Sequence, residues 1–256
     1  MDLKWIELTS PDLEQPPILA VIPIGSIEIH GPHLPLGIDT MVIERVAVEA
    51  VRNLDAVVLP PLPYAYVPEN RHFKGTISLS ADTFLRLLEE VCDEVYRNGV
   101  EKIVVLNGHG GNIRPLRLFI REVLSKKKKY CVYLIPEPWG LITDVIEEVK
   151  ETDEIGHACE IETSIALYLF PGLCRLYKVK RPAITGRKPP RGVETAVDWS
   201  GYAVEGYLGD PRKASVEKGR RLFKTWVSRL TRLLEQIIED KDCRGNLAKY
   251  YRAAYR

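Results

Sequence analysis

The chain has 256 residues, of which 45% are hydrophobic and 28% charged, and this composition is ordinary for a soluble globular enzyme. Its formal net charge of +1 gives no electrostatic reason to expect nucleic acid or an anionic membrane as a partner, and it favours a small-molecule substrate. The five cysteines are scattered without C-x-x-C spacing, which argues against a disulfide framework and against a structural zinc knuckle.

Further features bear on location and domain organisation. The N-terminal residues contain no apolar signal-peptide core, and no stretch approaches 18 uninterrupted apolar residues, so we expect a cytoplasmic protein. The chain contains only two Met and two Gln but many Lys, Arg and Glu residues, a bias associated with heat-adapted proteins. No break in composition divides the chain, and we expect a single domain over residues 1–256.

Apolar runs alternate with amphipathic segments along the chain. The predicted strands are 18–24, a short run from 56, a short strand within 70–80, 103–106 and 131–136. The predicted helices are 41–54, capped by Thr40, then 83–99, 114–129 with four lysines in its last turn, one within 136–156, 156–170 and 214–240. Residues 179–211 are expected to form loops, and the tail after Lys241 has no assignment. This alternation predicts an α/β fold in which helices cover both faces of a parallel sheet.

The first polar cluster follows the strand predicted at 18–24. The stretch IPIGSIEIHGPHLPLGIDT places Glu28, His30, His33 and Asp39 within twelve residues. If the backbone before it stays extended, Glu28 and His30 point to the same side. Imidazole nitrogen with carboxylate oxygen suits zinc, iron or manganese. The alternative is that these polar groups satisfy the backbone of a turn.

The second cluster, NGHGGN, follows the strand predicted at 103–106. His109 lies between Gly108 and the pair Gly110-Gly111, where the backbone can approach a ligand closely. In parallel sheets, binding sites lie beyond the carboxyl ends of the strands, and both clusters occupy that position. Phosphate binding is the weaker interpretation, because neither a Walker lysine nor a G-x-G-x-x-G spacing is present.

The third cluster lies in GHACEIETSIALYLF, which has a helical period. His157 and Glu160 are three residues apart and are expected to share a helix face, whereas Glu162 faces differently on a regular helix. The alternative is a solvated first turn whose glutamates favour the helix dipole. Four of the five histidines fall in the three clusters, and His72 has no assignment.

Together these motifs resemble the creatininase family of metal-dependent amidohydrolases. The resemblance rests on GSIEIHGPHLPLGIDT, NGHGGN, HACEIETS and GDPRKASVEKGR, and it covers most of the chain. It implies that Glu28, His30, Asp39 and His109 are metal ligands, with Asp39 bridging two metals, and that His157 is a catalytic histidine. It also implies a three-layer α/β/α fold with a mostly parallel central sheet and a closed homo-oligomer, usually a hexamer.

The sequence departs from the family pattern at two positions. Creatininases proper have a glutamate, a further metal ligand, where this chain has Gly111. Glu160 is the expected substitute, because family members with the Gly-Gly motif commonly carry such a glutamate. Ile29 replaces the usual glutamine. The missing glutamate argues against creatinine itself as the substrate, though not against hydrolysis.

The resemblance therefore implies a hydrolase of a cyclic amide or formamide with two divalent metal ions per subunit, zinc, iron or manganese, that activate a bridging water. His157 would move a proton to the leaving nitrogen, and Glu162 would orient that histidine if the helix begins irregularly. The backbone N–H groups of Gly110 and Gly111 are expected to face an oxyanion or an anionic substrate group. Trp139, Tyr64 and Tyr66 are candidates to wall the pocket, with packing as the alternative for each, and packing is favoured for the two tyrosines.

Three alternatives stay open on the sequence alone. One is an archaeal deformylase of a ribosylaminopyrimidine phosphate in flavin or deazaflavin synthesis, towards which the Gly-Gly motif and the composition point. Another is a relative that trims a short peptide during cofactor maturation. The last is a metal-binding oligomer without catalytic activity.

Overall fold

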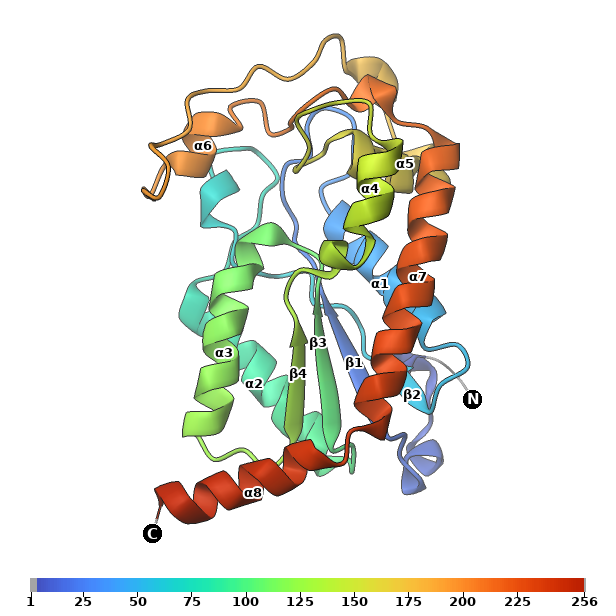
Figure 1. Cartoon of the computed structure of the whole chain (residues 1–256), viewed down its shortest axis with the longest axis vertical. Helices are drawn as coiled ribbons and strands as arrows, with labels where there is room; N and C mark the ends of the chain where they lie inside the picture. The colour runs from blue at the N-terminus through green and yellow to red at the C-terminus, as the bar shows by residue number, and fades with distance from the viewer. Residues whose placement is uncertain (1–3, 256) are drawn as a thin grey trace.

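A computed structural model describes residues 4–255, and a single parallel sheet lies at its centre (Figure 1). The strands run in the order β2-β1-β3-β4. Their bounds are β1 (Leu19–Ile24), β2 (Ala56–Val58), β3 (Lys102–Asn107) and β4 (Cys131–Ile135). Strand β1 pairs with β3 along its whole length, from Leu19 opposite Lys102 to Ile24 opposite Asn107. The loops that leave these two strands therefore start side by side.

Helices cover both faces of the sheet, with α2 and α3 on one side and α1 and α7 on the other (Figure 1). The helices are α1 (Ile38–Ala50), α2 (Ala81–Arg97), α3 (Ile113–Ser125), α4 (Thr143–Val149), α5 (Glu160–Leu169), α6 (Asp198–Tyr202), α7 (Val216–Glu239) and α8 (Asp242–Ala254). No helix among residues 4–255 combines the length and apolar character needed to cross a membrane.

Alternate residues of each strand supply two separate hydrophobic cores. Leu19 and Val21 of β1 pack with the core formed by α1, α5 and α7. Ala20 and Ile22 pack with the core formed by α2 and α3. A continuous apolar strand sequence is what burial on both faces requires, because successive side chains point to opposite sides. The three-layer α/β/α prediction is confirmed.

Several predicted boundaries are wrong. Helix α1 begins at Ile38 rather than after Thr40, so Asp39 lies in its first turn, and the Thr40 hydroxyl donates to the carbonyl of Ser26 at 3.0 Å. The lysines at 126–129 follow α3 instead of ending it, and Lys127 has a φ of 56°. Among the described residues, 70–80 form isolated bridges instead of a strand, and the tail forms α8.

The segment between α5 and α7 lies over the end of the molecule where the strands finish, and it runs yellow to orange at the top of Figure 1. It is mostly irregular, as predicted for 179–211, and it contains the short helix α6. This placement puts a covering segment above the carboxyl ends of β1 and β3, where the polar clusters emerge.

Candidate metal centre

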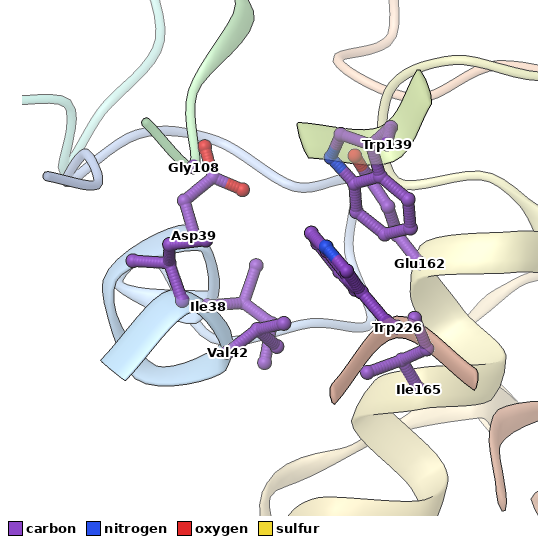
Figure 2. A pocket seen from close by; sticks show the side chains of 9 residues that line it. Ile38, Asp39, Val42, Gly108, Trp139, Glu162, Ile165 and Trp226 are labelled. Atoms are coloured by element: carbon purple, nitrogen blue, oxygen red, sulfur yellow. The ribbon is translucent and has the colours of Figure 1, made fainter. Parts of the chain in front are cut away.

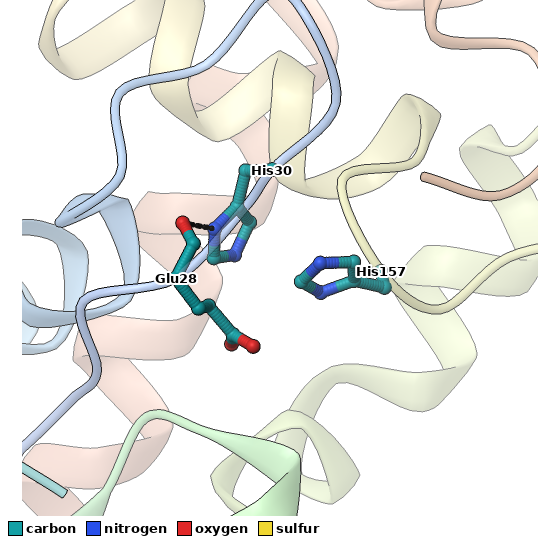
Figure 3. Close-up of side chains that lie close together, drawn as sticks. All are labelled: Glu28, His30 and His157. Atoms are coloured by element: carbon teal, nitrogen blue, oxygen red, sulfur yellow. Dashed lines mark hydrogen bonds between the residues drawn. The ribbon is translucent and has the colours of Figure 1, made fainter. Parts of the chain in front are cut away.

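The loop after β1 places two buried ligand residues next to the first turn of α1. Glu28 and His30 are both fully buried. His30 Nδ1 donates to the backbone carbonyl of Glu28 at 3.2 Å (Figure 3), and its Nε2 lies 3.0 Å from Asp39 Oδ1. A Cβ on Gly25 would lie 2.3 Å from the Thr40 nitrogen, so glycine is needed where this loop meets α1. The Nδ1 hydrogen bond orients the ring so that Nε2 faces Asp39.

The loop after β3 brings His109 to the same carboxylates. His109 Nδ1 lies 2.6 Å from Glu28 Oε1 and 3.2 Å from Asp39 Oδ2. A Cβ on Gly108 would lie 2.8 Å from Cβ of Ile43, so this glycine lets the end of β3 approach α1. Glu28, Asp39 and His109 form one triad whose ligand atoms all lie within 4.8 Å of one another. Asp39 thus presents one oxygen to His30 and the other to His109.

A second triad joins Glu28 and His30 to His157, which arrives from the loop before α5 (Figure 3). The ring centroids of His30 and His157 are 4.3 Å apart. His157 Nε2 lies 2.7 Å from the carbonyl of Ile29, so it carries the proton in the neutral ring. Nδ1 of His157 is therefore the nitrogen left to bind a metal ion or accept a proton.

The helical assumption for the third cluster is wrong at its start. Helix α5 begins at Glu160, and Ala158 just before it adopts a φ of 47°. His157 therefore lies outside the helix, and it does not share a helix face with Glu160. The helix start is irregular, but among residues 4–255 no hydrogen bond joins Glu162 to His157, whose Nε2 instead bonds the Ile29 carbonyl.

Glu160 points away from the two triads. Its carboxylate accepts hydrogen bonds from Lys218 Nζ at 2.6 Å, from the Glu151 N–H at 2.9 Å and from the Thr152 hydroxyl at 2.8 Å. The structure does not bring Glu160 to the other predicted ligands. Through these hydrogen bonds, the Glu160 side chain connects the start of α5 to α7 and to the loop that leads to His157.

Glu162 is the helix carboxylate that faces the cluster. It accepts a hydrogen bond from the Ala158 N–H. Together with Asp39, Trp139 and Trp226 it encloses a small cavity of about 10 Å³, enough for one water molecule (Figure 2). Burial and the neighbouring Asp39 raise the pKa of Glu162 to about 8.

The buried carboxylates and imidazoles shift each other's pKa values. Burial opposes the ionised form of Glu28, but His109 outweighs it and lowers the Glu28 pKa. Burial likewise disfavours a charged His30, yet Asp39 raises the His30 pKa to about 9. The pKa of Asp39 is held well below its usual range despite burial, chiefly by His30. Burial and the adjacent His30 lower the pKa of His157 to about 4.

The donor atoms gathered in this cluster suit divalent cations. Two buried carboxylates, Glu28 and Asp39, need compensating positive charge, which protons on His30 and His109 supply in the metal-free protein. A bound divalent ion would provide the same charge in place of those protons. Nitrogen with carboxylate oxygen is a donor set for zinc, iron or manganese. The residues present therefore fit two metal ions.

The site contains residues that sequence patterns did not identify. Asn70 Nδ2 donates to Glu28 Oε2 at 2.5 Å, and Trp199 Nε1 of α6 donates to Asn70 Oδ1 at 3.1 Å. The Trp199 ring packs edge-on against His157, with centroids 5.6 Å apart. The Ser26 hydroxyl contacts Glu28 Oε1 at 3.1 Å and Asp39 Oδ2 at 3.0 Å. Ser26 is inside the first motif, but Asn70 and Trp199 lie in segments without a periodic signal.

A cavity of about 780 Å³ opens from the cluster. Gly110, Gly111, Trp139 and Tyr66 line it, as does Glu162, so Trp139 walls the site as expected. Tyr66 lines the cavity and also packs against a core, whereas Tyr64 is half exposed and is not among the lining residues. Trp226 fixes the orientation of Trp139 by ring packing at 4.3 Å between centroids.

Given its contacts, Glu160 is expected to contribute to the stability of the fold and not to metal binding. We expect Glu160→Gln to leave the metal content unchanged and to lower the free energy of unfolding by about 3 kcal/mol, because Lys218 loses its buried partner. Glu151→Gln, which removes the other, exposed partner of Lys218, should cost less than about 1 kcal/mol. Metal analysis and urea unfolding check both. Loss of one metal in Glu160→Gln would restore Glu160 as a ligand.

Comparisons with known proteins identify the family of this chain. The family model "Creatininase: Creatinine amidohydrolase" matches residues 2–234. The creatinine amidohydrolase of Pseudomonas putida is 28% identical over 223 residues, which cover 81% of this chain and 85% of that protein. The mycofactocin precursor peptide peptidase of Mycolicibacterium smegmatis is 30% identical over 228 residues, covering 86% of this chain and 85% of that protein. The solved structure "Creatininase Mn" has a TM-score of 0.80 and 25% identity, covering 94% of this chain and 100% of that chain. This chain belongs to the creatininase family of hydrolases.

Proposed function

We propose that this protein hydrolyses a non-peptide C–N bond, in a cyclic amide or a formamide, with two divalent metal ions. The observation that carries the proposal is the arrangement of Asp39, whose two oxygens face His30 and His109 in turn. A carboxylate that presents one oxygen to each of two imidazoles is placed to bridge two metal ions. When bound, such ions lower the pKa of water and polarise a carbonyl group.

The ligands divide into two groups around Asp39. Glu28 and His109 would hold one ion with Asp39 Oδ2, and His30 would hold the other with Asp39 Oδ1. Glu162 takes the place proposed from sequence for Glu160, because Glu162 and Asp39 line the same cavities. This assignment supplies a carboxylate at the second position without the glutamate missing at Gly111. Related solved structures are described as "Creatininase Mn" and as a Zn-Zn type creatininase, which supports manganese and zinc among the three expected metals.

His157 is the proposed proton carrier. Its Nε2–H is held by the Ile29 carbonyl, and its low pKa keeps the ring neutral near pH 7. Nδ1 can then accept a proton from the attacking water and return it to the leaving nitrogen as the C–N bond breaks. Trp199 packs against this ring and keeps it in place. The backbone N–H groups of Gly110 and Gly111 are donors for a substrate carbonyl or an anionic group.

The cavity supports a substrate larger than a single small ring. Its volume of about 780 Å³ falls within the range of sites for drug-sized ligands, about 300–1,000 Å³. Arg114 and Arg117, at the start of α3, are among the residues that line this cavity, and they pair with Glu194 and Glu137. A formamide that carries an anionic group fits such a cavity, because its reacting end can meet the carboxylates and its anionic end the arginines.

A peptide substrate is the second candidate, and one specific observation favours it. The mycofactocin precursor peptide peptidase is as similar to this chain as the creatinine amidohydrolase is, with 30% and 28% identity. The two activities share attack of water on an amide carbon and differ in what the cavity must hold. The length of substrate that the protein cleaves therefore distinguishes them.

Metal analysis and three assays test the proposal together. We expect the purified protein to contain close to two divalent metal ions per chain, and chelation to remove activity and lower the melting temperature. Release of formate from formamides, formation of creatine from creatinine, and cleavage of short peptides are then measured with the metal-loaded protein. Formate release or ring opening supports the proposal, and peptide cleavage alone would replace it with the second candidate. A metal content near zero with no change on chelation would overturn every metal-dependent version.

A further inference from the structure

A carboxylate from a different loop fills the space beside Gly111. A Cβ on residue 111 would lie 2.2 Å from Oε1 of Glu69 and 2.5 Å from Nε2 of His109. Glu69 belongs to a short 3-10 turn, Pro68–Asn70, in the loop that follows β2. Real Cβ atoms essentially never approach another atom this closely, so the Glu69 carboxylate can lie here because residue 111 has no side chain.

The two ring nitrogens of His109 face different carboxylates. Nδ1 faces Glu28 and Asp39, which are its partners in the first triad. Nε2 faces Glu69, with 3.2 Å between Nε2 and Oε1. Nε2 is buried, and within the described residues it has no hydrogen bond of good geometry. This nitrogen therefore needs an acceptor, and the Glu69 carboxylate is within reach of it.

A metal ion at Nδ1 would require one particular tautomer of His109. A neutral imidazole that offers the Nδ1 lone pair to a metal ion carries its proton on Nε2. Such a proton is normally given to a carboxylate, a backbone carbonyl or water, and this hydrogen bond fixes the ring and strengthens the ligand. The Glu69 side chain is 21% exposed and its Oε1 is already 3.2 Å from Nε2, so the carboxylate has both the reach and the freedom to accept this proton.

We propose that Glu69 holds His109 in its metal-binding tautomer, and that glycine at 111 makes room for it. Glu69 is thus a positioning residue, because it touches the imidazole and acts on the metal through it. The next residue, Asn70, donates to Glu28 Oε2, so one short turn orients two ligands of the same triad. This inference rests on the proposed metal centre.

The test compares metal affinity in Glu69 variants. We expect Glu69→Ala to weaken binding of one of two Mn²⁺ ions by about 10- to 100-fold, and Glu69→Gln to weaken it less, because the amide oxygen still accepts. Glu137→Ala is the matched control: Glu137 pairs with Arg117 at 2.6 Å on the protein surface and should leave the affinity unchanged. Competition with a chelator at constant pH measures the affinities, and the melting temperature of each metal-free protein reports folding.

Nitrogen NMR of the zinc-loaded protein supplies a readout that a purely structural role would not change. The chain has five histidines, so each ring can be assigned with single substitutions. We expect the His109 Nε2–H proton to exchange slowly in the wild type and quickly in Glu69→Ala. Wild-type affinity in a folded Glu69→Ala, or an unchanged His109 spectrum, would overturn the inference while leaving the metal centre intact. A wild type without metal would instead overturn the proposed function, and the inference with it.

Discussion

Asp39→Ala is expected to remove both metal ions and to lower kcat by about 10³-fold, because it is the carboxylate shared by the two halves of the site. Its oxygens lie 3.0 Å from His30 Nε2 and 3.2 Å from His109 Nδ1. Without Asp39, each of the two proposed ions would lose a charged ligand, and the pair would lose its proposed bridge. Metal ions contribute several kcal/mol to such reactions, which corresponds to a loss of this size.

Metal analysis after gel filtration checks the Asp39 prediction. Asp198→Ala is the control for a carboxylate that lines the same cavity but belongs to neither triad, and it should keep both ions. Asp39→Asn retains the shape of the side chain and should keep less metal than the wild type. If Asp39→Ala retains two ions per chain, Asp39 is not the bridge and the division of ligands around it is wrong.

His157→Ala is expected to keep both metal ions and to lower kcat by about 10²- to 10⁴-fold, the range for loss of a general acid–base group. KM should change less, because the proposed metal-binding residues and the other groups that line the cavity remain in place. The physical reason is the orientation of the ring: Nε2 is fixed by the Ile29 carbonyl, which leaves Nδ1 to move a proton.

The same variant distinguishes two possible roles of His157, as a proton carrier and as a metal ligand. Its ligand atom also lies within 4.8 Å of those of Glu28 and His30, so a metal ion could use it. Loss of one ion per chain in His157→Ala would make it a ligand, whereas full metal content with full activity would remove it from the mechanism. His72→Ala is the matched control, because His72 is exposed and packs on Phe73 rather than on the cluster.

The sequence predicted the sheet and the first two clusters because both depend on local patterns. The apolar runs before Gly25 and before Asn107 can be buried on both faces only as central parallel strands. Once β1 and β3 are neighbours, the loops that follow them must meet at one edge of the sheet. Glu28, His30 and His109 therefore come together for reasons that can be read from the chain.

The sequence identified the residues of the third cluster, but it did not predict which of their side chains face the site. Periodicity treats 156–170 as one helix, whereas the helix starts at Glu160 after the left-handed Ala158. At that start the Glu160 carboxylate accepts a hydrogen bond from Lys218 of α7, 58 residues further along the chain. Tertiary packing thus turned Glu160 away from the site and Glu162 towards it.

The sequence by itself determined which chemistry this protein can hold, namely buried carboxylates and imidazoles at the ends of two adjacent strands. The tertiary structure decided which atoms face one another. Asn70 reaches Glu28 across 42 residues, and Trp199 reaches Asn70 across 129. Contacts of this kind join loops without periodicity, and their partners are set by how the layers pack rather than by any local preference of the chain. For that reason Glu69, Asn70 and Trp199 could be found only in the folded protein.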